Sequence, residues 1–166
     1  MADKSTNLLI TIMAAILLAA VLWWAWPEPP VDDEQAEMWL AYGIELFEKR
    51  EYEEALVDLA KVPAGSPPKA RALYYEGSSH MMLKDYEAAI VSLEQSLALN
   101  PGDTGTLYAL GVASFKLGNL KLAKGYFSAV LAINPNDEQA KGLMDIMASL
   151  ERTSTAESDE EGVTHE

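Results

Sequence analysis

The sequence predicts an all-α chain of three helical hairpins, preceded by one apolar helix long enough to cross a membrane. Three observations carry this prediction. Glycine, alanine and proline recur every 34 residues, apolar residues in each copy follow helical 3–4 spacing, and residues 8–26 contain no charge. At average glycine and proline frequencies such a lattice is not expected by chance. The recurring residues are Gly43, Gly77 and Gly111; Ala55, Ala89 and Ala123; and Pro67, Pro101 and Pro135.

The apolar segment 8–26 follows a short polar leader, residues 1–7. As a helix it would span about 28 Å, close to the ~30 Å hydrocarbon core of a bilayer. Tryptophans gather at its C-terminal end, as at a membrane–water interface, and prolines then stop the helix. We interpret it as an uncleaved transmembrane anchor. A cleaved signal peptide and a buried globular helix are the alternatives, although cleavage requires small residues where this segment ends in tryptophan.

The charges beside the anchor predict its orientation. Lys4 precedes it, whereas the following residues are acidic and no base occurs before Lys49. The positive-inside rule then places the N-terminus in the cytoplasm and the rest of the chain on the periplasmic or another extracytoplasmic side, as at a bacterial inner membrane. The opposite orientation stays open, because the basis is a single lysine.

Composition excludes several classes of function. The chain has no cysteine, which removes disulfides, thiolate metal sites and cysteine catalysis. A net charge of −14 argues against nucleic acid, whose phosphates require a basic face, and against adhesion to anionic lipid. Contact with the lipid bilayer is therefore expected only through residues 8–26.

The soluble part is predicted to begin after an extended, proline-rich and acidic linker, residues 27–35. Each hairpin combines two apolar-periodic segments with a short break, and the second and third copies both end in Asn-Pro. Asp85 and Asn119 are the expected N-caps of two second helices. The three repeats are 36–69, 70–103 and 104–137, with helices expected near 37–49, 51–62, 68–83, 86–99, 106–117 and 120–133.

A seventh helix, 138–151, carries one apolar stripe and is expected to cover the last hairpin. Stacked repeats leave their final apolar face bare, so a capping helix is needed there. The remaining residues, 152–166, are polar and acidic, and they predict a disordered tail.

Small residues are predicted to sit where the two helices of a hairpin cross. Glycine inside a helix costs up to ~1 kcal/mol relative to alanine, so three glycines in phase imply a packing reason. Alanine is expected opposite on the second helix, and larger residues fill the spaces between hairpins. The predicted packing residues are Trp39, Gly43, Ala55, Gly77, Ala89, Gly111, Ala123 and Phe127.

This lattice resembles the tetratricopeptide repeat, a 34-residue helical hairpin with these small residues and a terminal proline. The resemblance covers Ala36–Asp137 and includes Trp39 at the tryptophan position; Leu46, His80 and Ser114 depart from it where tyrosine is common. It implies a right-handed solenoid whose first helices line a concave face that binds proteins or peptides. The whole arrangement also resembles small bacterial membrane-anchored proteins of this family.

The resemblance implies which residues face the concave side. Most are apolar, aromatic or methionine, which suits an amphipathic helix or an extended hydrophobic segment of a client. Leu40 and Ile44 stand where the subfamily that clamps a C-terminal carboxylate has lysine and asparagine, which argues against a chaperone-tail clamp. The predicted groove residues are Leu40, Ile44, Phe47, Arg71, Tyr74, Ser78, Met81, Met82, Tyr108, Val112, Phe115 and Lys116, with Glu37, Glu48 and Gly105 at the same phases. Burial by a neighbouring repeat, the final helix or a second copy is the alternative.

No arrangement of residues predicts catalysis, a metal site or a cofactor. His80 is the only histidine before the tail, and no glycine-rich loop links a strand to a helix. We therefore expect no enzyme activity. The sequence favours a membrane-anchored adaptor that binds a peptide or helix of a client protein and assists assembly or maturation of a membrane or periplasmic complex. The alternative is a self-associating scaffold on the membrane surface.

Overall fold

The computed structural model describes residues 13, 16, 17 and 32–161, and side chains as far as residue 153. It divides the chain into two units, residues 1–31 and 32–166. The described part of the second unit is helical and contains no strand. Its helices are α2 (Asp33–Glu48), α3 (Tyr52–Ala60), α4 (Lys69–Met82), α5 (Tyr86–Leu99), α6 (Thr104–Lys116), α7 (Leu120–Ile133) and α8 (Glu138–Glu161).

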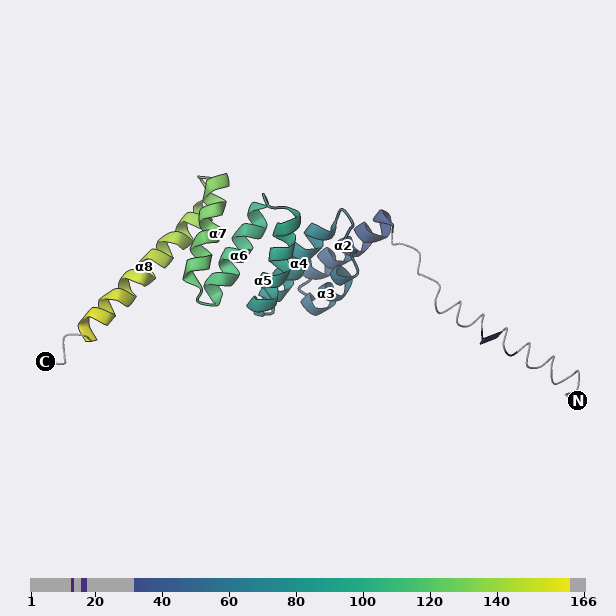
Figure 1. The fold of residues 1–166 in the computed structure, drawn as a ribbon, viewed down its shortest axis with the longest axis horizontal. Coiled ribbons are helices and arrows are strands. Elements are labelled where there is room, and N and C mark those ends of the chain that lie inside the picture. The colour runs from purple at the N-terminus through teal and green to yellow at the C-terminus, as the bar shows by residue number, and fades with distance from the viewer. Residues whose placement is uncertain (1–12, 14–15, 18–31, 162–166) are drawn as a thin grey trace, which may run out of the picture. The chain divides into compact units, whose positions relative to one another are not determined.

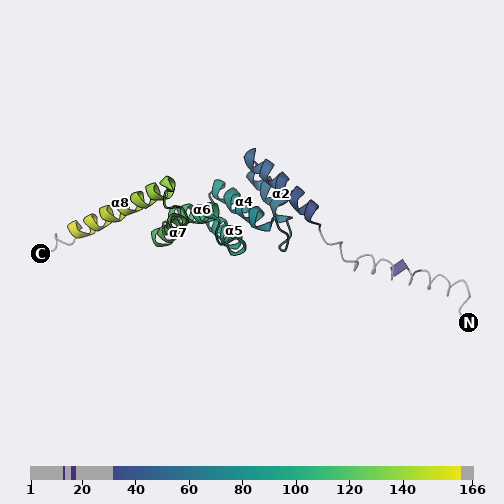
Figure 2. The ribbon, with the colours of Figure 1, turned by 90° about the horizontal axis from the view of Figure 1, so that it is seen from above.

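These helices form the predicted hairpins, and neighbours in sequence are neighbours in space (Figures 1 and 2). Within each hairpin α2 packs on α3, α4 on α5, and α6 on α7. The first helices also touch one another, since α2 contacts α4 and α4 contacts α6. α5 and α7 have the predicted bounds, and the ends of the other hairpin helices lie within a few residues of them. The all-α prediction is confirmed for the described part of the chain.

The anchor prediction lies almost wholly outside the described residues. Of segment 8–26 only Met13, Ile16 and Leu17 are described, and they are helical and exposed. None of the helices in the described part combines the length and the apolar character that a membrane span needs.

The first boundary differs from the prediction, because α2 begins at Asp33 rather than after residue 35. Asp32 is its N-cap, and the Asp32 carboxylate accepts a hydrogen bond from the Gln35 amide at 2.8 Å. Acidic Asp33 and Glu34 follow in the first turn, where the positive end of the helix dipole stabilises them. The acids taken as linker thus start the helix.

The last helix is also longer than predicted, since α8 runs past residue 151 to Glu161. The predicted tail therefore begins as helix, and its final residues, 162–166, lie outside the described residues. Residues 152–161 contain no glycine or proline, and their alanine, arginine and glutamates are good helix formers. The Arg152 Nε donates to the Ala148 carbonyl at 3.0 Å, which ties this extension to the preceding turn.

The glycine positions confirm the predicted helix crossings. A Cβ added to Gly43 would lie 2.5 Å from Leu59 Cγ, and one added to Gly77 would lie 2.5 Å from Leu93 Cγ. At Gly111 it would lie 2.7 Å from the Phe127 ring. The three predicted alanines on the second helices are fully buried, as are the three large partners of the glycines. Each hairpin therefore closes by seating one large apolar side chain on a bare glycine backbone.

A second repeated feature lies in the turns between paired helices. Arg50 (φ 67°), Lys84 (φ 65°) and Gly118 (φ 76°) share the left-handed conformation, one in each hairpin. The next amide donates back to the carbonyl five residues earlier, as Asp85 N does to His80 O at 2.9 Å. This is the Schellman type of helix ending, in which glycine is the usual residue because it has no Cβ to clash.

The N-cap predictions are confirmed in position. Asp85 precedes α5 and accepts from the Ala88 amide at 3.1 Å. Asn119 precedes α7, although its side chain makes no capping bond. Pro68, expected as the first helical residue, is instead the N-cap of α4, one position earlier in the helix convention.

We expect Lys84→Gly to raise the free energy of unfolding by about 0.5–1 kcal/mol, because glycine removes the left-handed strain at that turn. Urea unfolding followed by circular dichroism measures this. Lys121→Gly is the matched control, since Lys121 is exposed inside α7 and should lose up to ~1 kcal/mol. Loss of stability at both positions would contradict the assignment of strain to Lys84.

Gly77→Ala is expected to lower the free energy of unfolding by about 1–3 kcal/mol, because its methyl group would overlap Leu93. Gly125→Ala supplies the control: Gly125 is helical, nothing lies within 4 Å of its added Cβ, and alanine should stabilise it. Equal effects at the two glycines, measured by thermal unfolding, would show that the crossing does not require glycine.

Candidate functional site

A cavity of about 550 Å³ opens between the first helices of the second and third hairpins. α2, α4, α6 and the start of α8 supply its walls. It is lined by Phe47, Tyr74, Ser78, Met81, Met82, Thr104, Gly105, Tyr108, Ala109, Val112, Asp137 and Gln139. Seven of these are among the predicted groove residues: Phe47, Tyr74, Ser78, Met81, Met82, Tyr108 and Val112.

Helical spacing explains why these side chains converge. On α4, Tyr74, Ser78 and Met81 follow one another at intervals of four and three residues, which places them on one face. On α6, Tyr108 and Val112 do the same. Because the two helices are 34 residues apart in phase and touch, their lining faces lie side by side.

Ring packing holds the aromatic walls in place. Tyr108 meets Phe127 edge to face with ring centroids 5.5 Å apart, and Tyr74 meets Tyr75 at 5.4 Å. Phe47 is packed in the same way on Tyr75, at 5.5 Å. The Ser78 hydroxyl donates to the Tyr74 carbonyl at 2.8 Å, so it is already engaged within the helix. The cavity is therefore preformed rather than assembled from mobile side chains.

Five predicted groove residues do not line this cavity. Leu40 is only 1% exposed and belongs to the core that joins the first hairpin to Ala72 of α4, so its place in the groove is not what the structure shows. Ile44 packs against that same core. Phe115 is partly buried against the core of the third hairpin, Lys116 is exposed, and Arg71 lines a second cavity.

The predicted set omitted the contribution of α8 and its N-cap. Asp137 and Gln139 line the cavity, and Gln139 has the same 34-residue phase as Arg71 and Gly105. Extending the lattice beyond the third repeat would therefore have found it. At later steps of that phase stand Ile146 and Leu150, both exposed. The terminal helix caps α7 and also adds to the surface formed by the first helices.

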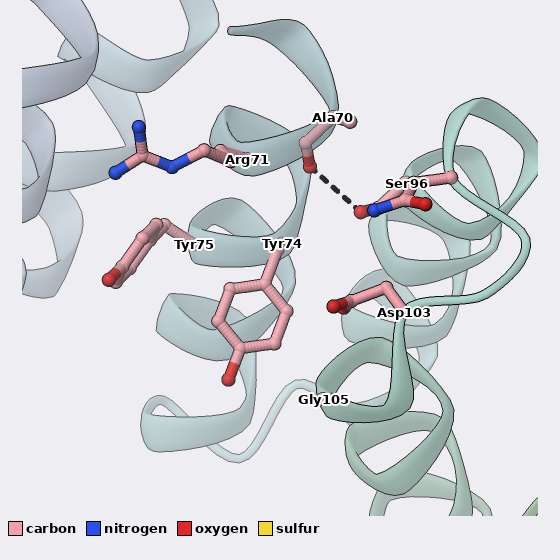
Figure 3. Close-up of a pocket in the computed structure, with 8 residues that line it drawn as sticks. Ala70, Arg71, Tyr74, Tyr75, Ser96, Asp103 and Gly105 are labelled. Atoms are coloured by element: carbon pink, nitrogen blue, oxygen red, sulfur yellow. Dashed lines mark hydrogen bonds between the residues drawn. The ribbon is translucent and has the colours of Figure 1, made fainter. Parts of the chain in front are cut away.

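The second cavity, about 290 Å³, adjoins the first and shares Tyr74 and Gly105 with it. Figure 3 shows Arg71 and Asp103 on opposite sides of this cavity. The Ser96 hydroxyl donates to the Ala70 carbonyl at 2.8 Å, which ties the end of α5 to the start of α4. Its lining residues are Ala70, Arg71, Tyr74, Tyr75, Ser96, Asn100, Asp103 and Gly105.

The carboxylates in the two cavities already serve as helix caps. Asp103 Oδ2 accepts from the Thr106 amide at 2.7 Å and from the Thr106 hydroxyl, at the start of α6. Asp137 Oδ1 accepts from the Ala140 amide at 2.9 Å, at the start of α8. Arg71, by contrast, is exposed and makes no ion pair with any described residue. Its charge is the one left available.

The resolved pKa shifts lie away from both cavities. Burial, reinforced by Glu94, raises the pKa of Tyr126, whose hydroxyl donates to Glu94 at 3.3 Å. A hydrogen bond to Glu45 raises the pKa of exposed Lys49. Among residues 32–153 no three histidine, aspartate or glutamate side chains gather closely enough to hold a metal ion.

Sequence comparison assigns the repeats to a family. Two models described as tetratricopeptide repeat match residues 43–104 and 80–146, which together span all three hairpins and part of α8. The chain belongs to the tetratricopeptide repeat family. This confirms the resemblance carried by the glycine, alanine and proline lattice. No curated protein matches the sequence significantly.

Solved structures of tetratricopeptide repeat domains share the fold. The first such domain of Spaghetti (RPAP3), solved bound to the HSP90 peptide SRMEEVD, has a TM-score of 0.68 and 25% identity. The match covers 72% of this chain and 95% of that one. MamA gives 0.62 and 23%, over 79% and 82% of the chains. PcrH, in complex with the chaperone-binding region of PopB, gives 0.60 and 16%, over 74% and 98%.

Proposed function

We propose that this tetratricopeptide repeat protein is a membrane-anchored adaptor that binds a segment of a client protein in the cavity between α4 and α6. The observation that carries the proposal is the preformed cavity of about 550 Å³ with seven of the predicted groove residues in its walls. It acts by binding and not by catalysis.

The size and chemistry of the cavity favour a short apolar segment. Binding pockets of ~300–1,000 Å³ with mostly apolar walls and a few polar groups are typical of specific ligand sites. Met81 and Met82 add side chains that adjust to different shapes. The repeat domain of Spaghetti (RPAP3), at 25% identity, supports peptide binding by this fold. The client chemistry differs, because Leu40 and Ile44 cannot pair with a C-terminal carboxylate as lysine and asparagine do.

The anchor and the side of the membrane belong to the same proposal. Segment 8–26 is uncharged and of spanning length, and only six residues separate it from α2 at Asp33. The repeats would therefore work close to the bilayer surface, on the periplasmic side if Lys4 marks the cytoplasmic end. A protein held there is suited to assist assembly or maturation of a membrane or periplasmic complex, as in the small bacterial anchored proteins of this family.

The groove is tested by photocrosslinking in the full-length protein. Benzoylphenylalanine placed at Met82, which lines the cavity and is 51% exposed, should yield a covalent adduct with a client. Val91, 56% exposed on α5 and outside the cavity, is the matched control position and should not. Val112→Lys, which puts a charge into the cavity, should abolish the Met82 adduct, whereas Val91→Lys should leave it unchanged.

Mass spectrometry of the adducts separates the outcomes. An adduct that persists in the Val112→Lys protein would contradict binding in the cavity. Adducts made only of two copies of this chain would contradict the adaptor and support the self-associating scaffold instead.

The anchor is tested by fractionation of cells that express the full-length protein. It should remain in the membrane pellet after alkaline carbonate extraction, and a chain lacking residues 1–26 should not. Alkaline phosphatase fused after Glu166 should be active if the repeats are exported. A soluble full-length chain would refute the anchor, and an inactive phosphatase fusion in the membrane fraction would reverse its orientation.

A further inference from the structure

We propose that the client segment lies extended across Gly105, with an apolar side chain in the larger cavity and an internal acidic side chain beside Arg71. This rests on the proposed function and specifies the chemistry of its client. The starting point is that the two cavities meet at Tyr74 and Gly105.

Gly105 is not a glycine that the fold requires. A Cβ added there would lie 3.5 Å from Asp103 Oδ2 and 3.8 Å from Tyr74 Cε2, which are ordinary contacts. Its backbone is also outside the left-handed region. Gly77, by contrast, would clash at 2.5 Å. A helical glycine costs up to ~1 kcal/mol, so Gly105 forgoes stability without a packing reason.

The missing side chain opens the passage between the cavities. At the same 34-residue phase the earlier hairpins carry long side chains, Glu37 and Arg71. A comparable side chain at residue 105 would stand between the Tyr74 ring and Asp103, where the cavities join (Figure 3). Glycine lets another backbone approach closely, and an extended chain is narrow enough to lie on one residue, whereas a helix is ~10–12 Å wide.

The charges of the smaller cavity select an acidic side chain. Asp103 on one side is already hydrogen-bonded to Thr106, and Arg71 on the other has no ionic partner among the described residues. Arg71 lies in the first turn of α4, and no side chain caps that helix. The positive end of its dipole adds to the attraction for a carboxylate. An arginine left unpaired at the mouth of a cavity offers two parallel donors to such a group.

The test uses the full-length protein in lipid nanodiscs and three short fluorescein-labelled peptides. Each carries one phenylalanine followed, two residues later, by Asp, Asn or Lys. Fluorescence anisotropy should show the Asp peptide binding roughly two- to fivefold more tightly than the Asn peptide, the range expected for one exposed ion pair, and the Lys peptide most weakly.

Arg71→Glu should reverse that order, so that the Lys peptide binds best. Lys121→Glu makes the same charge change on an exposed site of α7 and should preserve the original order. Gly105→Leu should weaken all three peptides and remove the preference among them. Gly125→Leu, at a helical glycine lining neither cavity, should leave both binding and preference intact.

The outcomes separate this inference from the proposed function. If the three peptides bind equally, and Val112→Lys blocks them while Arg71→Glu does not discriminate, the groove stands and the acidic preference is overturned. A preference for Lys in the unmodified protein would also overturn it and assign the smaller cavity to Asp103. If no peptide binds, both proposals fail.

Discussion

The contact between a glycine on the first helix of each hairpin and one large side chain on the second is the constraint on which the structure depends. Leu59, Leu93 and Phe127 occupy the space that a Cβ would take, and each is fully buried. Because the contact repeats every 34 residues, the three hairpins close in the same way and present their first helices in one row. The cavity between α4 and α6 is a consequence of that row, so the packing of the hairpins and the shape of the groove share one cause.

The stacking of hairpins then decides which side chains remain on the surface. Ala72 and Thr106 have the same phase and are fully buried, since each has a preceding hairpin against it. Met38 has that phase in the first hairpin and is 45% exposed, and Tyr42 is 52% exposed where Leu110 is buried. At the opposite end α8 covers α7 through Ala140 and Met147. Burial here is a property of the neighbour as much as of the residue.

Most of the fold could be predicted because the lattice records contacts made within one repeat. The crossing glycines, the Asp85 cap and the limits of α5 and α7 are of this kind. What failed depended on contacts outside the repeat unit. Leu40 is drawn into the core by Ala72, a residue of the next hairpin, and Gln139 reaches the cavity from a helix that completes no repeat. The left-handed turns escaped notice because only Gly118 of the three has the residue type that marks them.

The groove divides affinity from selectivity along its length. Burial of apolar surface in the larger cavity supplies about 25 cal/mol per Å², but that term is nearly indifferent to the order and direction of a client's residues. Charges supply less energy and more discrimination. Most of the acids behind the net charge of −14 lie elsewhere, and those in the two cavities, Asp103 and Asp137, are bonded to amides at helix starts where the dipole offsets them. Arg71 lies to one side of the apolar cavity, beyond Tyr74, so the polar signal is asymmetric. A client that satisfies both cavities can therefore lie in only one direction.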